Sequence, residues 1–188
     1  MANRAVFLDR DGTIIEEVNY LRRIEEMIVF PFAADALRSL SAAGFLNVVV
    51  SNQSAVARGF LDEGALKTIH EELARRLKKD GAIIDAFYYC PHHVEATIEK
   101  YRKACECRKP RPGLIFLAAS DLQIDVMSSF VVGDRAGDIG AAREAGCRSV
   151  LVKTGYGETA LNELNGLKPD YVAENLLEAA EWIIAADR

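Results

Sequence analysis

Long hydrophobic runs are missing from this sequence. No apolar stretch approaches the roughly 20 residues that a membrane-spanning helix needs. The opening Met-Ala-Asn-Arg leads directly into a short apolar run, without the apolar core of a secretory signal. We therefore expect no membrane partner and a cytoplasmic location.

A strong excess of charge of one sign is also missing. The chain has 23 Lys and Arg residues against 28 Asp and Glu residues, and its basic residues are dispersed along a chain of formal net charge −5. Sequence-independent binding of nucleic acid needs a basic face. We therefore expect no nucleic-acid partner, and any local cation to serve a smaller anion.

Cysteine is scarce as well, with four residues, of which three fall between Cys90 and Cys107. Without an export signal, free thiols or metal ligands are favoured over disulfides. Repeats, low-complexity tracts and linkers are not found either. The 188 residues are 50% hydrophobic and 27% charged, which is enough to bury a substantial core, so we expect one domain over residues 1–188, acting as a monomer.

Short apolar segments alternate along the chain with segments of helical periodicity. The apolar segments are too continuous for a sheet with one wet face. Alternation of this kind predicts a Rossmann-like α/β fold, a three-layer sandwich with a mainly parallel central sheet between helices. We expect strands at 6–8, 45–50, 83–89, 129–132, 149–152 and 171–173, and helices at 33–43, 63–79, 114–121, 138–146 and 176–186.

The first apolar run ends abruptly in Asp9 and Asp11, with Gly12 and Thr13 behind them. Residues that follow a strand of a parallel sheet fall in the crevice where open α/β sheets bind ligands. There the pair would offer a nucleophilic carboxylate, a carboxylate for proton transfer and oxygen ligands for Mg²⁺. Taken alone, the motif is equally compatible with a solvated Asp-Gly turn.

Two further predicted strands end in polar side chains that should enter the same crevice. Ser51 follows the second strand and Asp134 follows the fourth. Lys109, beside Arg108, is a candidate cation for spreading the charge of a transferring phosphoryl group. Because the sequence has no P-loop, carboxylates with a hydroxyl and a lysine predict Mg²⁺-dependent phosphoryl transfer to Asp9.

These residues add up to a resemblance to a known family. The segments at 9–13, 51–53, 109–110 and 133–134 resemble, in order, the four motifs of the haloacid dehalogenase superfamily of phosphatases. Four motifs in order are strongly specific, and the match spans about the whole chain. The resemblance implies the haloacid dehalogenase type of α/β fold.

The resemblance also implies roles for single residues. Asp9 would be the nucleophile and Asp11 the general acid and base, while Ser51 and Lys109 would steady the phosphoryl group. Mg²⁺ would be held by Asp9, Asp11 and Asp134. Related enzymes often have threonine at the place of Ser51, and the hydroxyl group is kept here.

Within the superfamily, the sequence resembles the phosphatases of D-glycero-D-manno-heptose 1,7-bisphosphate, with the histidinol-phosphate phosphatases as close kin. The first branch implies Mg²⁺-dependent hydrolysis of the 7-phosphate through an aspartyl-phosphate intermediate. The reaction would serve the biosynthesis of nucleotide-activated heptose for lipopolysaccharide core or surface glycans. The second branch, in histidine biosynthesis, is the alternative.

The residues expected around the crevice favour the sugar bisphosphate. Its second dianion needs cations and hydrogen-bond donors, whereas the amine and imidazole of histidinol phosphate need carboxylates or neutral acceptors. The stretch 51–59 also resembles the heptose branch more closely. We expect nine substrate-binding residues: Glu17, Val18, Asn19, Tyr20, Asn52, Gln53, Ser54, Arg58 and Arg108.

Cys90, His92, Cys105 and Cys107 lie in an irregular excursion and form a C-x-H and C-x-C set. Three sulfurs and an imidazole compose a closed tetrahedral zinc shell. The spacing is tighter than the usual two intervening residues, and buried free thiols are the alternative. The resemblance, which includes this loop, favours zinc, so we predict a zinc-binding loop at about 90–107 that also fixes the two basic residues following it.

Two other features are given no role in the chemistry. The glycine pattern at 155–160 follows a strand and is similar to a dinucleotide fingerprint, which also requires a full helix at once. Only a single turn is expected here, so we interpret the pattern as a flexible loop near the crevice. His70, beside the apolar stripe of its helix, is expected to be a surface or packing residue.

Functions of other classes remain as alternatives. A catalytically idle phosphosugar-binding module would not need the acidic and basic motif residues, which are all present. Phosphotransferases and mutases share aspartyl-phosphate chemistry but need a cap that excludes water. Because the gap from Asp11 to Phe45 is too short for a separate cap domain, we expect a capless phosphatase of a small phosphorylated sugar, with water as the acceptor.

Overall fold

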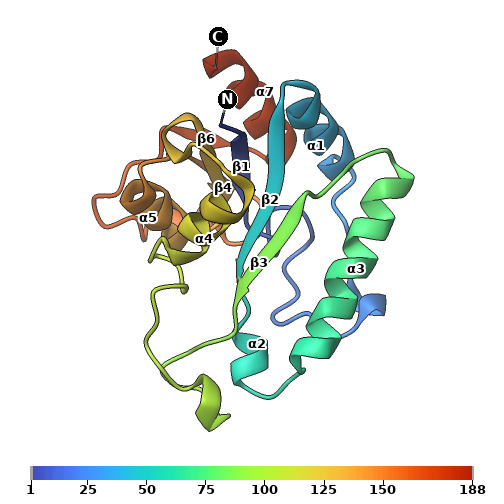
Figure 1. Cartoon of the computed structure of the whole chain (residues 1–188), viewed down its shortest axis with the longest axis vertical. Coiled ribbons are helices and arrows are strands. Elements are labelled where there is room, and N and C mark those ends of the chain that lie inside the picture. The colour runs from blue at the N-terminus through green and yellow to red at the C-terminus, as the bar shows by residue number, and fades with distance from the viewer. Residues whose placement is uncertain (1, 188) are drawn as a thin grey trace.

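The computed structural model describes residues 2–187, and within them six parallel strands form one sheet (Figure 1). The strand order is β3-β2-β1-β4-β5-β6, and every neighbouring pair is parallel. The prediction of a mainly parallel sheet is therefore confirmed. The strands are β1 (Arg4–Leu8), β2 (Phe45–Asn52), β3 (Ala86–Cys90), β4 (Phe130–Gly133), β5 (Arg148–Val152) and β6 (Tyr171–Ala173).

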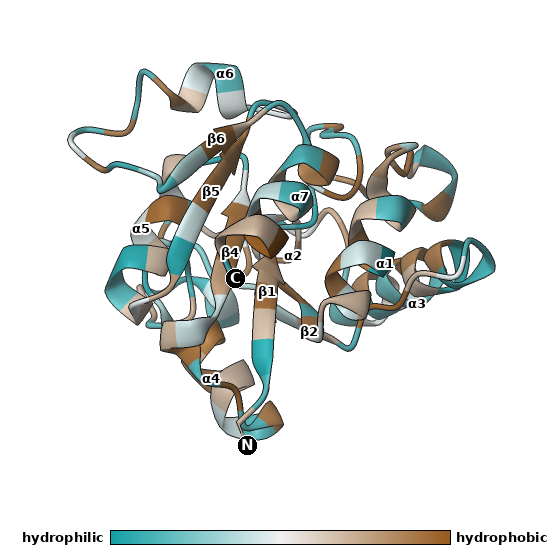
Figure 2. Ribbon diagram, turned by 90° about the horizontal axis from the view of Figure 1, so that it is seen from above, coloured by the Kyte–Doolittle hydropathy of each residue, from teal (hydrophilic) through white to brown (hydrophobic). Residues whose placement is uncertain are grey.

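Helices cover both faces of the sheet and complete the three-layer sandwich (Figure 2). On one face lie α1 (Ala33–Ala42), α3 (Glu63–Lys79) and α7 (Leu176–Ala186); on the other lie α4 (Gly113–Leu122) and α5 (Ala136–Ala145). The remaining short elements are α2 (Ser54–Ala57), α6 (Gly157–Ala160) and the 3-10 turns η1 (Ile24–Glu26), η2 (Glu99–Tyr101) and η3 (Val126–Ser128).

The alternation of side chains along β1 explains why the sheet is buried on both sides. Val6 and Leu8 belong to the apolar cluster under α1, α3 and α7, while Ala5 and Phe7 belong to the cluster under α4 and α5. All four are completely buried. A strand with two buried faces is a continuous apolar run, which is the pattern that the sequence shows.

The order of the strands places a crevice next to β1. From β1 the chain adds β2 and β3 on one side and then crosses to add β4, β5 and β6 on the other. The carboxyl ends of β1 and β4 are therefore neighbours at a switch point of the sheet, where α/β folds bind ligands. The excursion that follows β3 lies beside α2, beyond the end of β2, and its residues Thr97 and Ile98 donate to the carbonyl of Ala57 (Figure 1).

Several boundaries differ from the sequence expectation, and two of them have a clear local reason. The strand expected at 83–89 begins only at Ala86, because the carbonyl of Ile83 accepts from the Asn47 side chain and the Asp85 carboxylate accepts from the Asn47 backbone. Helix α2 is an unexpected single turn. Helix α5 begins at Ala136, two residues before the expected start, because Asp138 caps it from inside the first turn.

The segment between β1 and α1 holds no cap domain. Residues 9–32 form a loop whose regular structure is η1 and two isolated bridges, from Ile15 to Asp11 and to Val29. Ile14, Ile15 and Met27 bury this loop against the core. None of the helices in residues 2–187 is long and apolar enough to span a membrane.

Candidate functional site

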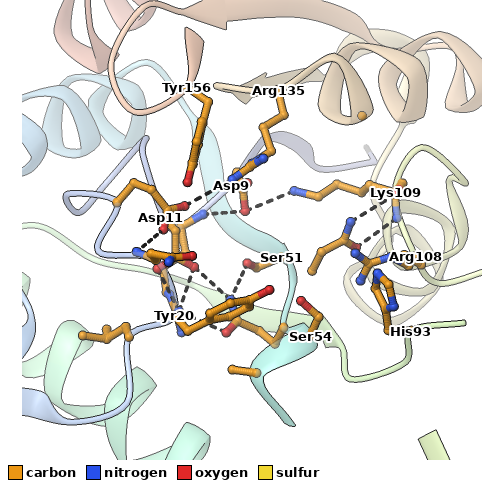
Figure 3. Close-up of a pocket in the computed structure, with 18 of the residues that line it drawn as sticks. Asp9, Asp11, Tyr20, Ser51, Ser54, His93, Arg108, Lys109, Arg135 and Tyr156 are labelled. Carbon is orange, nitrogen blue, oxygen red and sulfur yellow. Dashed lines mark hydrogen bonds and ion pairs between the residues drawn. The ribbon is translucent and has the colours of Figure 1, made fainter. Parts of the chain in front are cut away.

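A cavity of about 440 Å³ opens at the carboxyl edge of the sheet (Figure 3). The loops that follow β1, β2 and β4 border it, together with the segment that leads into α4. Most residues that the sequence placed in the site line this cavity: Asp9, Asp11, Glu17, Asn19, Tyr20, Ser51, Asn52, Gln53, Ser54, Arg58, Arg108 and Lys109.

Two predicted site residues do not line the cavity. Val18, predicted to bind substrate, packs instead against the apolar core under α1, so its neighbours Glu17 and Asn19 alone face the opening. Asp134 is completely buried beneath the floor. Its Oδ2 accepts a hydrogen bond of 2.8 Å from the backbone N–H of Tyr156.

Three carboxylates gather at the floor of the cavity. Asp9, Asp134 and Asp138 each have an oxygen within 4.8 Å of the others, and all three residues are buried. Asp134 Oδ1 has no hydrogen-bond partner in residues 2–187. A buried, unpaired carboxylate oxygen beside two more carboxylates is a donor set that suits a hard cation such as Mg²⁺.

Glycine at position 12 is required by the close packing around Asp134. Its φ is +77°, in the left-handed region, and a Cβ atom there would lie 2.1 Å from Asp134 Oδ2. Gly155 approaches the same carboxylate beside Gly12, and its Cβ would lie 2.2 Å from that oxygen. The loop at 155–160 was interpreted as flexible, but its first residues are packed against the floor of the site.

Lys109 brings one positive charge into this acidic group. Its Nζ lies 2.6 Å from Asp138 Oδ1 and 3.1 Å from Asp9 Oδ1, and it donates to the carbonyl of Val50 at 2.7 Å. Figure 3 shows the side chain extended toward Asp9. Asn52 fixes the lysine backbone, accepting from its N–H and donating to its carbonyl.

The electrostatics of the floor follow from burial and from an excess of carboxylates. Burial, followed by the charges of Asp9 and Asp138, raises the pKa of Asp134 to about 8. Burial also raises the pKa of Asp138 to about 6, despite the opposing charge of Lys109. The same carboxylates overcome burial at Lys109 and raise its pKa.

Asp11 stands apart from the three carboxylates. Both of its oxygens accept from Arg10 Nη2, at 2.9 and 2.7 Å, and Oδ2 also accepts from Gln53 Nε2 at 3.0 Å. Asp138 takes its place in the cluster. The sequence therefore located Asp11 in the cavity, but this geometry does not support its side chain as a ligand of the same cation as Asp9 and Asp134.

The mouth of the cavity is bordered by cations. Arg108 is anchored by a hydrogen bond of 3.1 Å to the carbonyl of His92, and Arg58 lies nearby on the same lining. Arg135, on the other side, lies 3.5 Å from Glu17 and stacks 3.8 Å above the ring of Tyr156. Figure 3 shows the two sides facing each other across the opening.

A second group of ligand atoms lies in the excursion after β3. Cys90, His92, Cys105 and Cys107 converge, with sulfur separations of 3.1 to 3.4 Å and the His92 Nδ1 within 3.4 and 3.7 Å of two sulfurs. These separations exceed an S–S bond of about 2.05 Å. Two sulfurs at about 2.3 Å from one tetrahedral Zn²⁺ ion would lie roughly 3.8 Å apart, and a sulfur and an imidazole nitrogen roughly 3.5 Å apart. The His92 contacts match these values and the sulfurs lie closer together, so the four atoms converge as the ligands of one metal ion would.

Several lining residues were missed by sequence reasoning. Asp138 lies one helical turn after Asp134, a spacing that brings the two side chains to one side of a helix start, and this signal could have been used. Arg135, Tyr156 and His93 carry no comparable signal, because their positions depend on how loops from separate strands meet.

The fold and the carboxylate site are those of a HAD-like hydrolase, and a family model described as HAD-hydrolase-like matches residues 106–179. The D-glycero-D-manno-heptose-1,7-bisphosphate 7-phosphatase of Thermosynechococcus vestitus is 39% identical over 97% of this chain and 96% of its own length. The D-glycero-beta-D-manno-heptose-1,7-bisphosphate 7-phosphatase of Salmonella typhi is 39% identical over 96% of this chain and 89% of its own length.

A solved structure agrees with these relatives. The D,D-heptose 1,7-bisphosphate phosphatase from B. bronchiseptica, complexed with magnesium and phosphate, superposes with a TM-score of 0.87. It is 33% identical, and the match covers 97% of this chain and 99% of that chain. The chain therefore belongs to the D-glycero-D-manno-heptose-1,7-bisphosphate 7-phosphatase family of HAD-like hydrolases.

The raised pKa of Asp134 leads to a prediction for the metal-free protein. With a pKa of about 8 in the folded chain and about 3.9 when unfolded, this carboxyl holds a proton in the folded state that the unfolded state has released. The free energy of unfolding should therefore fall as the pH rises from about 4 to 8. In excess chelator at pH 8, Asp134→Asn should be more stable than the wild type, and the difference should shrink as the pH falls toward 4.

Urea unfolding at a series of pH values measures this effect. Asp80→Asn, which changes an exposed carboxylate at the end of α3, is the matched control and should follow the wild type. An Asp134→Asn variant with the same pH dependence as the wild type would contradict the account of the carboxylate cluster.

Proposed function

We propose that this chain hydrolyses the 7-phosphate of D-glycero-D-manno-heptose 1,7-bisphosphate, with Mg²⁺ and through an aspartyl-phosphate intermediate on Asp9. The observation that carries the proposal is the contact between the Asp9 carboxylate and Lys109 at the floor of a cation-bordered cavity. The relatives of this name, similar over nearly the whole chain, support the substrate.

Asp9 is held as a nucleophile should be. Its Oδ1 accepts from the backbone N–H of Arg10 at 2.8 Å and lies 3.1 Å from Lys109 Nζ. No hydrogen bond within residues 2–187 engages Oδ2, so this oxygen is available for attack on phosphorus. Because the other oxygen is fixed twice, the carboxylate has one orientation and loses little entropy in reaching the reacting geometry.

The phosphoryl oxygens would be bound by Lys109 and Ser51. The Ser51 hydroxyl accepts from Gln53 Nε2 at 2.7 Å, which leaves its own hydrogen free to donate to a phosphoryl oxygen. Lys109 would spread the negative charge that develops on the transferring group. Both side chains are almost completely buried, so their interactions with that group are poorly screened by water.

Asp9 and Asp134 would hold Mg²⁺, as the unpaired Oδ1 of Asp134 indicates. Asp138 is the weaker candidate because Lys109 and the backbone N–H of Arg135 engage its oxygens. Bound there, the ion would offset the repulsion between the Asp9 carboxylate and a phosphate dianion. The magnesium and phosphate bound to the relative from B. bronchiseptica support Mg²⁺ as the ion.

Asp11 would carry the proton between the two halves of the reaction. It would give a proton to the sugar oxygen that leaves and later take one from the water that attacks the phosphorus. The open cavity and the lack of a cap in the described residues favour water as the acceptor over a second sugar. The fixed Asp9 carboxylate and its contact with Lys109 argue against a binding module without catalytic activity, which would not need them.

The charges at the mouth favour a sugar bisphosphate over histidinol phosphate. Arg58 and Arg108 line the cavity and could meet a second phosphate group. Glu17, the carboxylate that could meet an amine, is already paired with Arg135. The names of the relatives also favour the heptose substrate, and the product would enter nucleotide-activated heptose biosynthesis for lipopolysaccharide. A cytoplasmic location and a monomeric state stay predictions.

We also propose that Cys90, His92, Cys105 and Cys107 bind one structural zinc ion. The four ligand atoms gather within 4.8 Å of one another, and four protein ligands leave no open position for water. The metal would fix the segment that carries Arg108 directly after Cys107.

Replacing Asp9 tests the proposed chemistry. Asp9→Asn should lower turnover of the heptose bisphosphate about a thousandfold or more, because it removes the nucleophilic oxygen, while the fold is kept. Phosphate release and circular dichroism measure the two effects, with Asp80→Asn as the control. Turnover at the wild-type rate in Asp9→Asn would contradict the aspartyl-phosphate mechanism, and activity in excess chelator with no metal detected would contradict Mg²⁺.

Elemental analysis tests the zinc proposal. We expect about one zinc per chain in the wild type and a large loss of zinc in Cys105→Ser, because three ligands hold the ion far less tightly than four. Cys147→Ser is the matched control, since this cysteine lies in the apolar core outside the cluster. Purified wild type without zinc, together with an unchanged Cys105→Ser variant, would show that the four residues are an ordinary thiol-rich loop.

A further inference from the structure

Arg10 is an unusual residue at the centre of the site. It stands between Asp9 and Asp11, yet only 1% of its surface is exposed, and it is among the largest fully buried side chains. Its Nε has no hydrogen-bond partner in the described part of the chain. Burying a guanidinium in this way contributes little to stability, because the desolvation cost offsets much of the attraction to its partner. The contacts of Arg10 point to another purpose.

Each terminal nitrogen of Arg10 has its own partner. Nη2 donates to both carboxylate oxygens of Asp11 and to Gln53 Oε1 at 3.0 Å. Nη1 lies 3.2 Å from Nε2 of His70, on α3. Gln53 in turn donates to Asp11 and to Ser51. The guanidinium is therefore held from two sides, and the Asp11 carboxylate is fixed by two neighbours, where dashed lines converge in Figure 3.

His70 can only be an acceptor in this contact. A guanidinium has no lone pair to offer, so the Nε2 atom of the imidazole must be unprotonated. Burial, followed by the charge of Arg10, lowers the pKa of His70 to about 3 and keeps the ring neutral. The ring stacks on Phe87 at 4.7 Å with an interplanar angle of 15° and meets Tyr89 edge-on. Its orientation is thus set by packing against β3.

We infer that His70 and Arg10 are positioning residues for proton transfer by Asp11. His70 holds the Arg10 guanidinium, and the guanidinium holds the Asp11 carboxylate. This inference rests on the proposed function. The expectation that His70 is a surface or packing residue is incomplete, because its ring packs in the core and also orients the guanidinium.

The role of the pair is defined by the two steps that Asp11 serves. In the first step, the bond between phosphorus and the sugar oxygen breaks as the bond from Asp9 to phosphorus forms, and the proton of Asp11 goes to the sugar oxygen. In the second step, a water oxygen bonds to phosphorus, the bond to Asp9 breaks, and a water proton returns to Asp11. Both steps need the Asp11 carboxyl in one place, and Arg10 stabilises the carboxylate left after the first.

The first step offers a test that separates positioning from folding. A sugar oxygen is a poor leaving group and needs the proton from Asp11, whereas the phenolate of p-nitrophenyl phosphate leaves with little help. His70→Phe keeps the stack on Phe87 but removes the acceptor for Arg10. It should lower kcat/KM at least about tenfold for the heptose bisphosphate, or for any alkyl phosphate that the wild type hydrolyses, and less than about threefold for p-nitrophenyl phosphate.

Three companion variants complete the experiment. His70→Gln, which offers an amide oxygen to Arg10, should recover most of the loss. Arg10→Lys keeps the charge but loses the second contact, and it should show the same dependence on the leaving group even if His70→Phe does not fold. Ile69→Val, a neighbouring buried change on α3, should leave the ratio of the two kcat/KM values unchanged.

The outcomes distinguish the inference from the proposed function. If His70→Phe and Arg10→Lys lose kcat/KM equally for both substrates, or lose none, the inference is overturned. The proposed phosphatase function would still stand, because the wild type remains active. A wild type that hydrolyses other alkyl phosphates but not the heptose bisphosphate would overturn the proposed substrate alone. A wild type inactive on every phosphate ester would overturn both.

Discussion

The buried contact of Lys109 with Asp9 and Asp138 is the interaction on which the rest of the site depends. It places one positive charge among three carboxylates that would otherwise repel one another in a poorly screened environment. It also joins four parts of the chain, because Lys109 contacts the ends of β1 and β2 and the start of α5 while standing beside the cysteine cluster. The excess negative charge that remains would favour a cation at the floor.

The fold supplies this arrangement through the order of its strands. Because β1 lies between β2 and β4, the carboxyl ends of all three strands meet at one edge of the sheet. Glycine at position 12 lets the chain turn directly over Asp134. The cavity stays open because residues 9–32 are packed down against the core and form no cap. An open site with a fixed Asp9 carboxylate suits the proposed hydrolysis.

Much of this site could be predicted from the sequence, since Asp9, Ser51 and Asp134 each come directly after a run of apolar residues. The parts that could not be predicted depend on tertiary contacts. The direction of Val18 follows from how its loop folds onto the core, and the carboxylate of Asp11 turns away from the cation site because Arg10 is buried beside it. Neither a buried arginine nor a histidine contact that spans 60 residues leaves a pattern in the sequence.

The substrate is the central claim, and one comparison tests it most directly. Wild-type protein with Mg²⁺ is given D-glycero-D-manno-heptose 1,7-bisphosphate and histidinol phosphate side by side, and kcat/KM is measured for each. The account predicts loss of the 7-phosphate from the sugar with a kcat/KM at least about tenfold above that for histidinol phosphate, equivalent to about 1.4 kcal/mol of transition-state stabilisation. Histidinol phosphate hydrolysed equally well or better would contradict it.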